Sequence, residues 1–250
     1  MTVVTQLSFV QALDKLRYAQ KSAKGAPAYS RFVNRKAGRV LAAAAYRIGA
    51  TPNQVTAVSA LFTYAAIAVV ALVPPAPAVG VIITALLVVG YALDAADGQL
   101  ARLRGGGSAA GEWLDHVVDA AKISALHLAV LIAAYQHFDV APQWLLVPIG
   151  FTVVAAVMFF AMILNDLLRR ATGAGPTAPP GAKHSAVRSI LVVPTDYGLL
   201  CITFLTFGFP TVFGVVYTGL FAANAAFLAL ALVKWFREAG RLDVDRGGAR

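Results

Sequence analysis

Four aspartates lie close together in the sequence as two pairs, Asp94 with Asp97 and Asp115 with Asp119. Only 12 of the 250 residues are acidic, and long apolar runs flank the four aspartates on both sides. Residues three or four positions apart share one face of a helix, so a helical hairpin would gather four carboxylates at the end of two membrane helices. In a low dielectric these carboxylates repel one another unless a cation neutralises them, and oxygen ligands select a hard divalent ion such as Mg2+, Mn2+ or Ca2+. The sequence therefore predicts a metal site.

The aspartates belong to a longer pattern, D-x2-D-G-x2-A-R-x8-G-x3-D-x3-D, which also specifies glycine, alanine and arginine. Two helix ends that merely expose aspartates to solvent do not require those additional residues. The pattern resembles the signature of the CDP-alcohol phosphatidyltransferase family. The resemblance implies that a substituted phosphate group passes from a CDP-alcohol to the hydroxyl group of a small polar alcohol or alcohol phosphate, with release of CMP. The chain meets the pattern without a gap at Asp94, Asp97, Gly98, Ala101, Arg102, Gly111, Asp115 and Asp119.

The same resemblance implies a role for each aspartate. We expect two Mg2+ or Mn2+ ions, or one such ion together with a basic residue, to neutralise phosphoryl oxygens as charge moves to the leaving group. Asp119 is also the expected general base, which takes the proton from the acceptor hydroxyl. The expected metal ligands are Asp94, Asp97 and Asp115, with Asp119 sharing a metal.

By the same resemblance, seven positions are expected to contact the CDP-alcohol donor, and a short polar segment among them is expected to help hold its cytidine nucleotide. Arg102 follows Gly98 by one helical turn, and its guanidinium group suits a pyrophosphate, whereas Gly98 leaves room for the nucleotide. Ser108 follows three glycines whose backbone N–H groups phosphate oxygens can reach, although a serine is also ordinary in such a loop. The polar segment from Asn53 to Thr56 has an alternative role as the cap of a membrane helix. The seven positions are Asn53, Gln54, Val55, Thr56, Gly98, Arg102 and Ser108.

Two further charged residues accompany the second pair of aspartates. Glu112 gives the segment G-E-x-x-D-H, which resembles the choline- and ethanolamine-phosphotransferase version of the pattern. Glu112 shares a helix face with Asp115 and Asp119 and either supports the metal site or favours the start of a helix through its charge. Lys122 lies one turn beyond Asp119, where a membrane lysine needs a partner. We therefore expect Lys122 to form a salt bridge with the carboxylates.

Composition places the chain in a membrane. Hydrophobic residues make up 59% of the sequence and charged residues 13%, and the mean hydropathy is +0.71. These values lie outside the ordinary range of soluble proteins. A single cysteine excludes a disulfide framework. The net charge of +9 is distributed as expected for an anionic membrane surface and anionic substrates, so no nucleic-acid partner is expected.

Apolar runs near twenty residues long predict an all-α, polytopic membrane fold with six transmembrane helices. An amphipathic helix from Ser8 to Lys24 is expected either to lie on the membrane surface or to form a solvated helical tail, and a second from Tyr29 to Ala50 is expected to lie at the interface before the first span. We divide the chain into N-terminal helices at 1–50, a membrane domain at 51–236 and a disordered tail at 237–250. The predicted spans are Val55–Val73, Val79–Leu93, Gly111–Tyr135, Trp144–Leu168, Ile190–Phe207 and Val212–Trp235.

The distribution of lysine and arginine predicts the orientation of these spans. The first, third and fifth connections, VPPAPA, QHFDVAP and GFPT, contain neither residue. By the positive-inside rule both termini and the aspartates face the cytoplasm. The long connection from Arg169 to Ser189 lies on the same side. Its basic residues bind either anionic headgroups or a phosphate group of the acceptor; the candidates for acceptor binding are Arg169, Arg170, Lys183 and Arg188.

The identity of the substrates stays open at this stage. The family resemblance favours CDP-diacylglycerol as the donor, a role in phospholipid biosynthesis, a homodimer, and the plasma membrane of a bacterium as the location. The segment YSRFVNR faintly resembles family members that use a polar donor, CDP-inositol. An alternative of another class is a six-helix cation transporter that uses buried aspartates, although Gly98 and Arg102 disfavour it.

Overall fold

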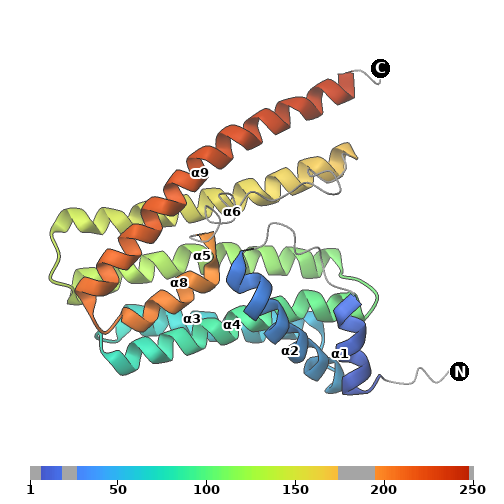
Figure 1. The fold of residues 1–250 in the computed structure, drawn as a ribbon, viewed down its shortest axis with the longest axis horizontal. Coiled ribbons are helices and arrows are strands. Elements are labelled where there is room, and N and C mark those ends of the chain that lie inside the picture. Colours follow the sequence, from blue (N-terminus) through green and yellow to red (C-terminus); the bar gives the residue numbers. More distant parts are fainter. Residues whose placement is uncertain (1–6, 19–26, 174–194, 248–250) are drawn as a thin grey trace, which may run out of the picture.

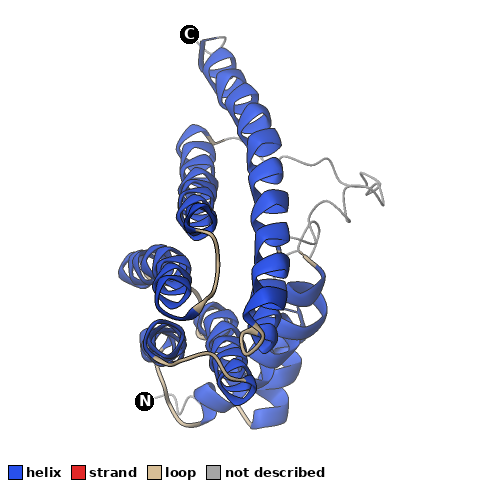
Figure 2. Ribbon diagram, turned by 90° about the vertical axis from the view of Figure 1, so that its left-hand side faces the viewer, coloured by secondary structure: helices blue, strands red, loops and turns tan. Residues whose placement is uncertain are grey.

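The computed structural model describes residues 7–18, 27–173 and 195–247, and helices are the only regular secondary structure in these ranges (Figure 1, Figure 2). Five helices are long and apolar enough to cross a membrane. Each contains most or all of one predicted span. The chain is therefore an integral membrane protein built from helices. The five are α3 (Pro52–Leu72), α4 (Pro77–Leu103), α5 (Ala109–His137), α6 (Leu146–Thr172, preceded by the short helix η2, Pro142–Leu145) and α9 (Pro210–Gly247).

The predicted fifth span, Ile190–Phe207, differs from the other five. In the described part it consists of α8 (Tyr197–Thr203) and the short helix η4 (Phe204–Thr206). At 1.5 Å per residue this apolar stretch is about 15 Å long, roughly half the thickness of a bilayer core. Residues 190–194 lie outside the described residues, so a count of six full spans is not confirmed.

The helices form a bundle with two distinct ends. Figure 1 shows the α3–α4 loop, the α5–α6 connection and the start of α9 at one end, on the left. The N-terminal helices α1 (Phe9–Tyr18) and α2 (Arg35–Arg47), the α4–α5 turn, and the last turns of α6 and α9 lie toward the other end. The aspartate pairs flank the α4–α5 turn, so they belong to this second end.

Close packing joins α3 to α4 just before the first aspartate. Ser59 donates a hydrogen bond to the backbone oxygen of Gly90, at 2.9 Å. A side chain at Gly90 would meet the hydroxyl of Thr63, so only glycine lets the two helices approach this closely. This contact positions Asp94 one helical turn further along α4.

A glycine turn connects α4 to α5. Gly105 and Gly106 have φ values of +102° and +136°, in the region that favours glycine. Ser108 then caps α5 by accepting a hydrogen bond from the backbone N–H of Gly111. Because the chain reverses direction here, the aspartates of α5 face Asp94 on α4.

The N-terminal segment packs across α4. It contains the π-helix η1 (Ser30–Asn34), which continues directly into α2. Gly38 of α2 lies against Ala95 of α4, where an added Cβ would be 2.9 Å from the Ala95 Cβ. The buried side chains of Ala42 and Ala43 also face the bundle. The predicted N-terminal segments are thus partly helical, and their location at a membrane surface stays a prediction.

The tail predicted to be disordered from residue 237 is instead helical as far as Gly247. Charge pairs at its beginning explain the difference. Glu238 is 2.9 Å from Arg169 of α6 and 3.5 Å from Lys234 one turn earlier in α9. A high content of charged residues and glycine predicted disorder, but it did not reveal that α6 supplies a partner for Glu238.

Candidate active site

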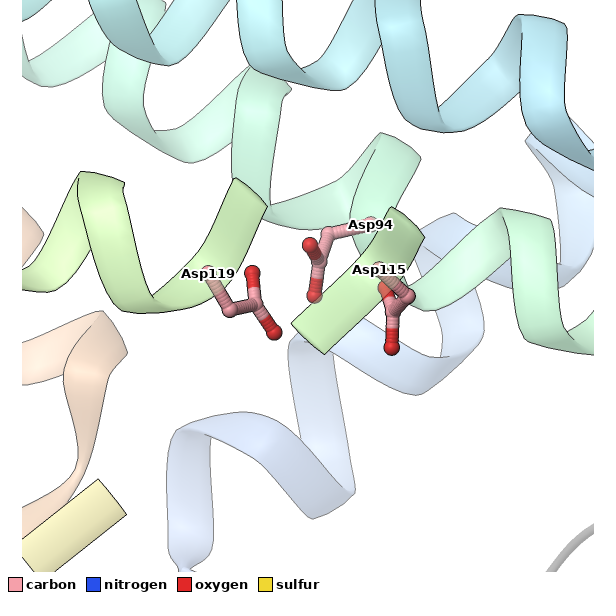
Figure 3. A group of neighbouring side chains, drawn as sticks. All are labelled: Asp94, Asp115 and Asp119. Carbon is pink, nitrogen blue, oxygen red and sulfur yellow. The ribbon is translucent and has the colours of Figure 1, made fainter. Parts of the chain in front are cut away.

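Three of the four aspartates come together between α4 and α5. One carboxylate oxygen each from Asp94, Asp115 and Asp119 lies within 4.8 Å of the others. Figure 3 shows Asp94 entering this group from α4 and the other two from successive turns of α5. The i,i+4 spacing of Asp115 and Asp119 puts both on the same face of α5, as the sequence predicts. We call these three side chains the carboxylate cluster.

Lys122 neutralises part of this negative charge. Its ammonium nitrogen lies 2.7 Å from Asp94 Oδ1 and 2.6 Å from Asp119 Oδ1, and its side chain is 8% exposed. The salt bridge expected from the sequence is therefore present. Lys122 contacts Oδ1 of Asp94 and Oδ1 of Asp119, so the Oδ2 atoms of these two carboxylates take no part in either contact.

Asp97 is not a member of the carboxylate cluster. Its carboxylate is buried and accepts hydrogen bonds from the Thr56 hydroxyl, at 2.6 Å, and from the backbone N–H of Gly98. The side chain still lines the same cavity as Asp94 and Asp115. A ligand role for Asp97 therefore requires an ion that reaches toward Thr56 and α3.

A cavity of about 270 Å3 lies beside these carboxylates. This volume is close to the lower limit of small-molecule sites, about 300 Å3. Arg102 lines it from the last turn of α4, and Gly98 separates Arg102 from the aspartates. An added Cβ at Gly98 would be 3.6 Å from the Arg102 guanidinium group, so the arginine side chain extends back along the helix toward the aspartates. The cavity thus combines carboxylates with a guanidinium group.

The other predicted donor-binding residues are engaged in local structure. Thr51 and Gln54 form a capping box at the start of α3, and Val55 packs in an apolar cluster. Asn53 lies near Gly111, where an added Cβ would be 3.0 Å from its side-chain oxygen. Ser108 caps α5. Of the segment Asn53–Thr56, the structure connects Thr56 directly to an aspartate of the site, through Asp97.

The predicted acceptor-binding arginines form ion pairs within the chain. Arg169 pairs with Glu238, and Arg170 pairs with Asp166 and, at 2.8 Å, with Glu112. Glu112 therefore contacts Arg170 rather than the carboxylate cluster, while His116 lies 3.9 Å from Glu112 and 3.6 Å from Asp115. Lys183 and Arg188 lie outside the described residues.

The structure adds cavity residues that sequence reasoning did not select. Ser30, Asn34 and Arg35 line the cavity from η1 and α2, and Tyr91 lines it from α4. The polar and basic segment YSRFVNR was the available signal. Nothing in its periodicity places it beside aspartates 60 residues away, because that contact depends on how α2 packs on α4.

The carboxylate cluster fits a hard divalent cation. Such an ion binds oxygen ligands at about 2.0–2.6 Å, so ligand oxygens within 4.8 Å of one another can share one ion. Four carboxylates, counting Asp97, exceed the single positive charge of Lys122. The donor set therefore favours Mg2+ or Mn2+ over softer metals that prefer thiolate or imidazole ligands.

Comparison with protein families gives one match. Residues 49–236 match the family model described as CDP-alcohol phosphatidyltransferase. The match includes α3 to α6, α8 and all four aspartates, and it leaves η1 and α2 outside. It does not support the transporter alternative. No curated protein matched the chain in a separate comparison.

Proposed function

Because the chain belongs to the CDP-alcohol phosphatidyltransferase family, we propose that it transfers a substituted phosphate group from CDP-diacylglycerol to the hydroxyl group of a small polar alcohol or alcohol phosphate, with release of CMP. Family membership makes the chain an enzyme that acts on a CDP-alcohol. The observation that carries the proposal is the convergence of Asp94, Asp115 and Asp119 beside a cavity that Arg102 also lines.

Asp119 is the proposed general base. The proton of the acceptor hydroxyl passes to a carboxylate oxygen of Asp119 as the acceptor oxygen forms a bond to the β-phosphorus of the donor. The bond between that phosphorus and the oxygen of CMP breaks in the same displacement. Lys122 supports this role because its contact with Asp119 Oδ1 fixes the orientation of the carboxylate.

Binding of the donor is divided between carboxylates and a guanidinium group. A divalent cation held by Asp94, Asp97 and Asp115 would neutralise the phosphoryl oxygens of the donor. Arg102 is the proposed partner of the pyrophosphate, because a guanidinium fork matches phosphate oxygens and its side chain extends over Gly98. Thr56 acts through Asp97, whose carboxylate it holds by a hydrogen bond.

One observation favours the second candidate donor, CDP-inositol. Three polar residues, Ser30, Asn34 and Arg35, line the cavity from the N-terminal segment. The hydroxyl groups of a polar alcohol attached to the donor phosphate can both donate and accept hydrogen bonds there, whereas the acyl chains of a diacylglycerol can do neither. The two donors share the same reaction and differ in the group that is transferred.

We place the site at the cytoplasmic face of the membrane, because the first, third and fifth connections between the predicted spans contain no lysine or arginine. The plasma membrane of a bacterium is part of the proposal through family resemblance. A homodimer is part of the proposal through family resemblance.

CMP release tests the proposed function. The purified chain in detergent is incubated with CDP-diacylglycerol or CDP-inositol, each with a panel of alcohols and alcohol phosphates. We expect CMP only when a matching acceptor is present, loss of activity in excess EDTA, and recovery with Mg2+ or Mn2+. Full turnover in EDTA would contradict the metal requirement, and absence of CMP with every donor would contradict the reaction.

A further inference from the structure

Ser30, Asn34 and Arg35 form one wall of the cavity, which we call the N-terminal wall. These residues lie before residue 49, where the family match begins. Asn34 is 3% exposed, although it is polar and adjacent to a membrane domain. The side of the cavity formed by α4 and α5 carries three carboxylates and the guanidinium group of Arg102, whereas the N-terminal wall carries a guanidinium group and two uncharged polar groups.

The N-terminal wall is held in place at its first residues by Asp196. This buried carboxylate precedes α8 and accepts hydrogen bonds from the backbone N–H groups of Tyr29, at 2.7 Å, and Ser30, at 3.4 Å. It also accepts one from the N–H of Gly198, at 3.1 Å. Gly198 contacts the ring of Tyr29 so closely that no side chain fits there. Asp196 therefore ties the start of the wall to a segment 167 residues away.

The end of the N-terminal wall is fixed on α4. The Gln99 side chain donates a hydrogen bond to the backbone oxygen of Arg35, at 3.2 Å. The contact between Gly38 and Ala95 holds the next turn of α2 against the same helix. Because both ends are anchored, the backbone that carries Arg35 is ordered before any ligand binds, which reduces the entropy lost on binding.

The charges of the cavity indicate what the wall binds. Arg35 and Arg102 line the same cavity of about 270 Å3, so two guanidinium groups share a small volume. The same cavity is lined by Asp94, Asp97 and Asp115, and a divalent cation held by these carboxylates would leave the two guanidinium groups to attract an anion with two or more negative charges. A phosphate ester or pyrophosphate has this charge, and its oxygens match guanidinium forks. The hydroxyl of Ser30 and the amide of Asn34 can donate further hydrogen bonds.

We propose that Arg35, together with Ser30 and Asn34, forms a binding site for a phosphate group of a substrate, adjacent to Arg102. The inference rests on the proposed function for the identity of that substrate. The phosphate belongs either to the pyrophosphate of the CDP-alcohol donor or to a phosphorylated acceptor. Both sources have the same chemistry, and kinetics separates them.

Binding of inorganic pyrophosphate and of CDP tests the site directly. Isothermal titration of the purified full-length chain in detergent compares wild type with Arg35→Gln and Arg35→Lys. A lost hydrogen-bonded charge lowers affinity by about 10- to 100-fold, so Arg35→Gln should weaken pyrophosphate binding by that factor. Arg35→Lys should be intermediate, because lysine keeps the charge and loses the planar fork. Arg31→Gln is the matched control, since Arg31 is exposed on the same segment and lies beside Phe32 rather than in the cavity.

Kinetics of CMP release identifies which substrate carries the phosphate. A rise of about tenfold or more in the donor KM, with weakened CDP binding, assigns the site to the donor. A similar rise in the acceptor KM, with unchanged CDP binding, assigns it to a phosphorylated acceptor. Asp196→Asn, which weakens the anchor of the wall, should shift the same KM in the same direction by a smaller factor and leave the other KM unchanged. A purely structural role would not produce this selectivity.

The proposal would be overturned if the Arg35 variants keep a pyrophosphate affinity, a donor KM and an acceptor KM that are all within about twofold of wild type. If Arg35→Gln does not fold, Arg35→Lys decides by the same criterion. If the wild-type chain binds pyrophosphate through Arg35 but releases no CMP with any donor, the proposed reaction fails while the phosphate site stands. The two ideas are therefore tested separately.

Discussion

Lys122 of α5 donates a hydrogen bond to Asp94 of α4, with 2.7 Å between the ammonium nitrogen and Asp94 Oδ1. This contact joins α4 to α5 within the carboxylate cluster, to which each pair of aspartates contributes at least one side chain. The same ammonium lies 2.6 Å from Asp119, so one lysine orients both a proposed metal ligand and the proposed base.

The first prediction concerns this lysine. Lys122→Met removes the ammonium group that lies between the carboxylates of Asp94 and Asp119. We expect kcat to fall at least tenfold because Asp119 loses its orientation, and half-saturation to occur at lower Mg2+ because the cluster becomes more negative. Breaking a buried pair also costs about 3 kcal/mol of stability. Metal titrations of CMP release and thermal unfolding in detergent measure these effects.

Lys234→Met is the matched control for Lys122. Lys234 pairs with Glu238 at 3.5 Å and is 53% exposed, far from the carboxylate cluster. We expect its metal dependence to equal that of wild type. An unchanged kcat and an unchanged Mg2+ requirement in Lys122→Met would remove Lys122 from the site.

The second prediction separates the aspartates by role. Asp119→Asn preserves the size of the side chain but cannot take up the proton. We expect kcat to fall by about 10^2- to 10^4-fold, with donor binding nearly unchanged. Asp94→Asn and Asp97→Asn should instead weaken Mg2+ and donor binding together. Wild-type turnover by Asp119→Asn would exclude it as the base.

The third prediction concerns the hydrogen bond from Thr56 to Asp97. Thr56→Val keeps the shape of the side chain and leaves a buried carboxylate without its hydroxyl donor. We expect the free energy of unfolding to fall by about 1.5–3 kcal/mol and the donor KM to rise severalfold. Thr152→Val is the control, because the Thr152 hydroxyl donates to the backbone oxygen of Pro148 within α6 and Thr152 does not line the cavity. A donor KM that moves equally in both variants would argue against a specific role for Thr56.

The fourth prediction concerns the proposed role of Arg170 in acceptor binding. In the described part of the chain Arg170 is paired with Glu112 and Asp166, and it would have to exchange one of them for an acceptor phosphate. Exposed pairs exchange readily. If Arg170 binds a phosphorylated acceptor, Arg170→Gln should raise the acceptor KM about threefold or more, whereas Glu112→Gln should lower it. An acceptor KM that neither change moves would assign Arg170 to the surface charge pairs alone.

Much of the site follows from local geometry that the sequence already contains. The i,i+3 and i,i+4 spacings of the aspartates place each pair on one helix face whatever the rest of the chain does. The glycines after Arg104 predict a reversal between the pairs. The apolar runs predict six spans, and five of these correspond to helices long enough to cross a membrane. The convergence of Asp94, Asp115 and Asp119 could therefore be predicted, as could the salt bridge of Lys122.

The tertiary structure determined which partner each of the other acidic side chains contacts. Asp97 lies at the predicted spacing, but contact with α3 gives it Thr56 as a partner instead of the other carboxylates. Glu112 shares the predicted face of α5, yet α6 supplies Arg170 as its partner. Each outcome depends on which side chain a different helix presents, and periodicity along one helix carries no information about that.

The sequence by itself determined the membrane helices and the carboxylate face, because both depend on residues within a few helical turns of one another. Only the tertiary structure placed Arg35 at the wall of the cavity and brought the backbone N–H of Tyr29 within hydrogen-bonding distance of Asp196. Those contacts join segments separated by about 60 and 167 residues, and they form only when α2 packs on α4 and the residue before α8 reaches the backbone of Tyr29. Packing between distant helices, which buries apolar surface and satisfies buried polar groups, is the physical cause.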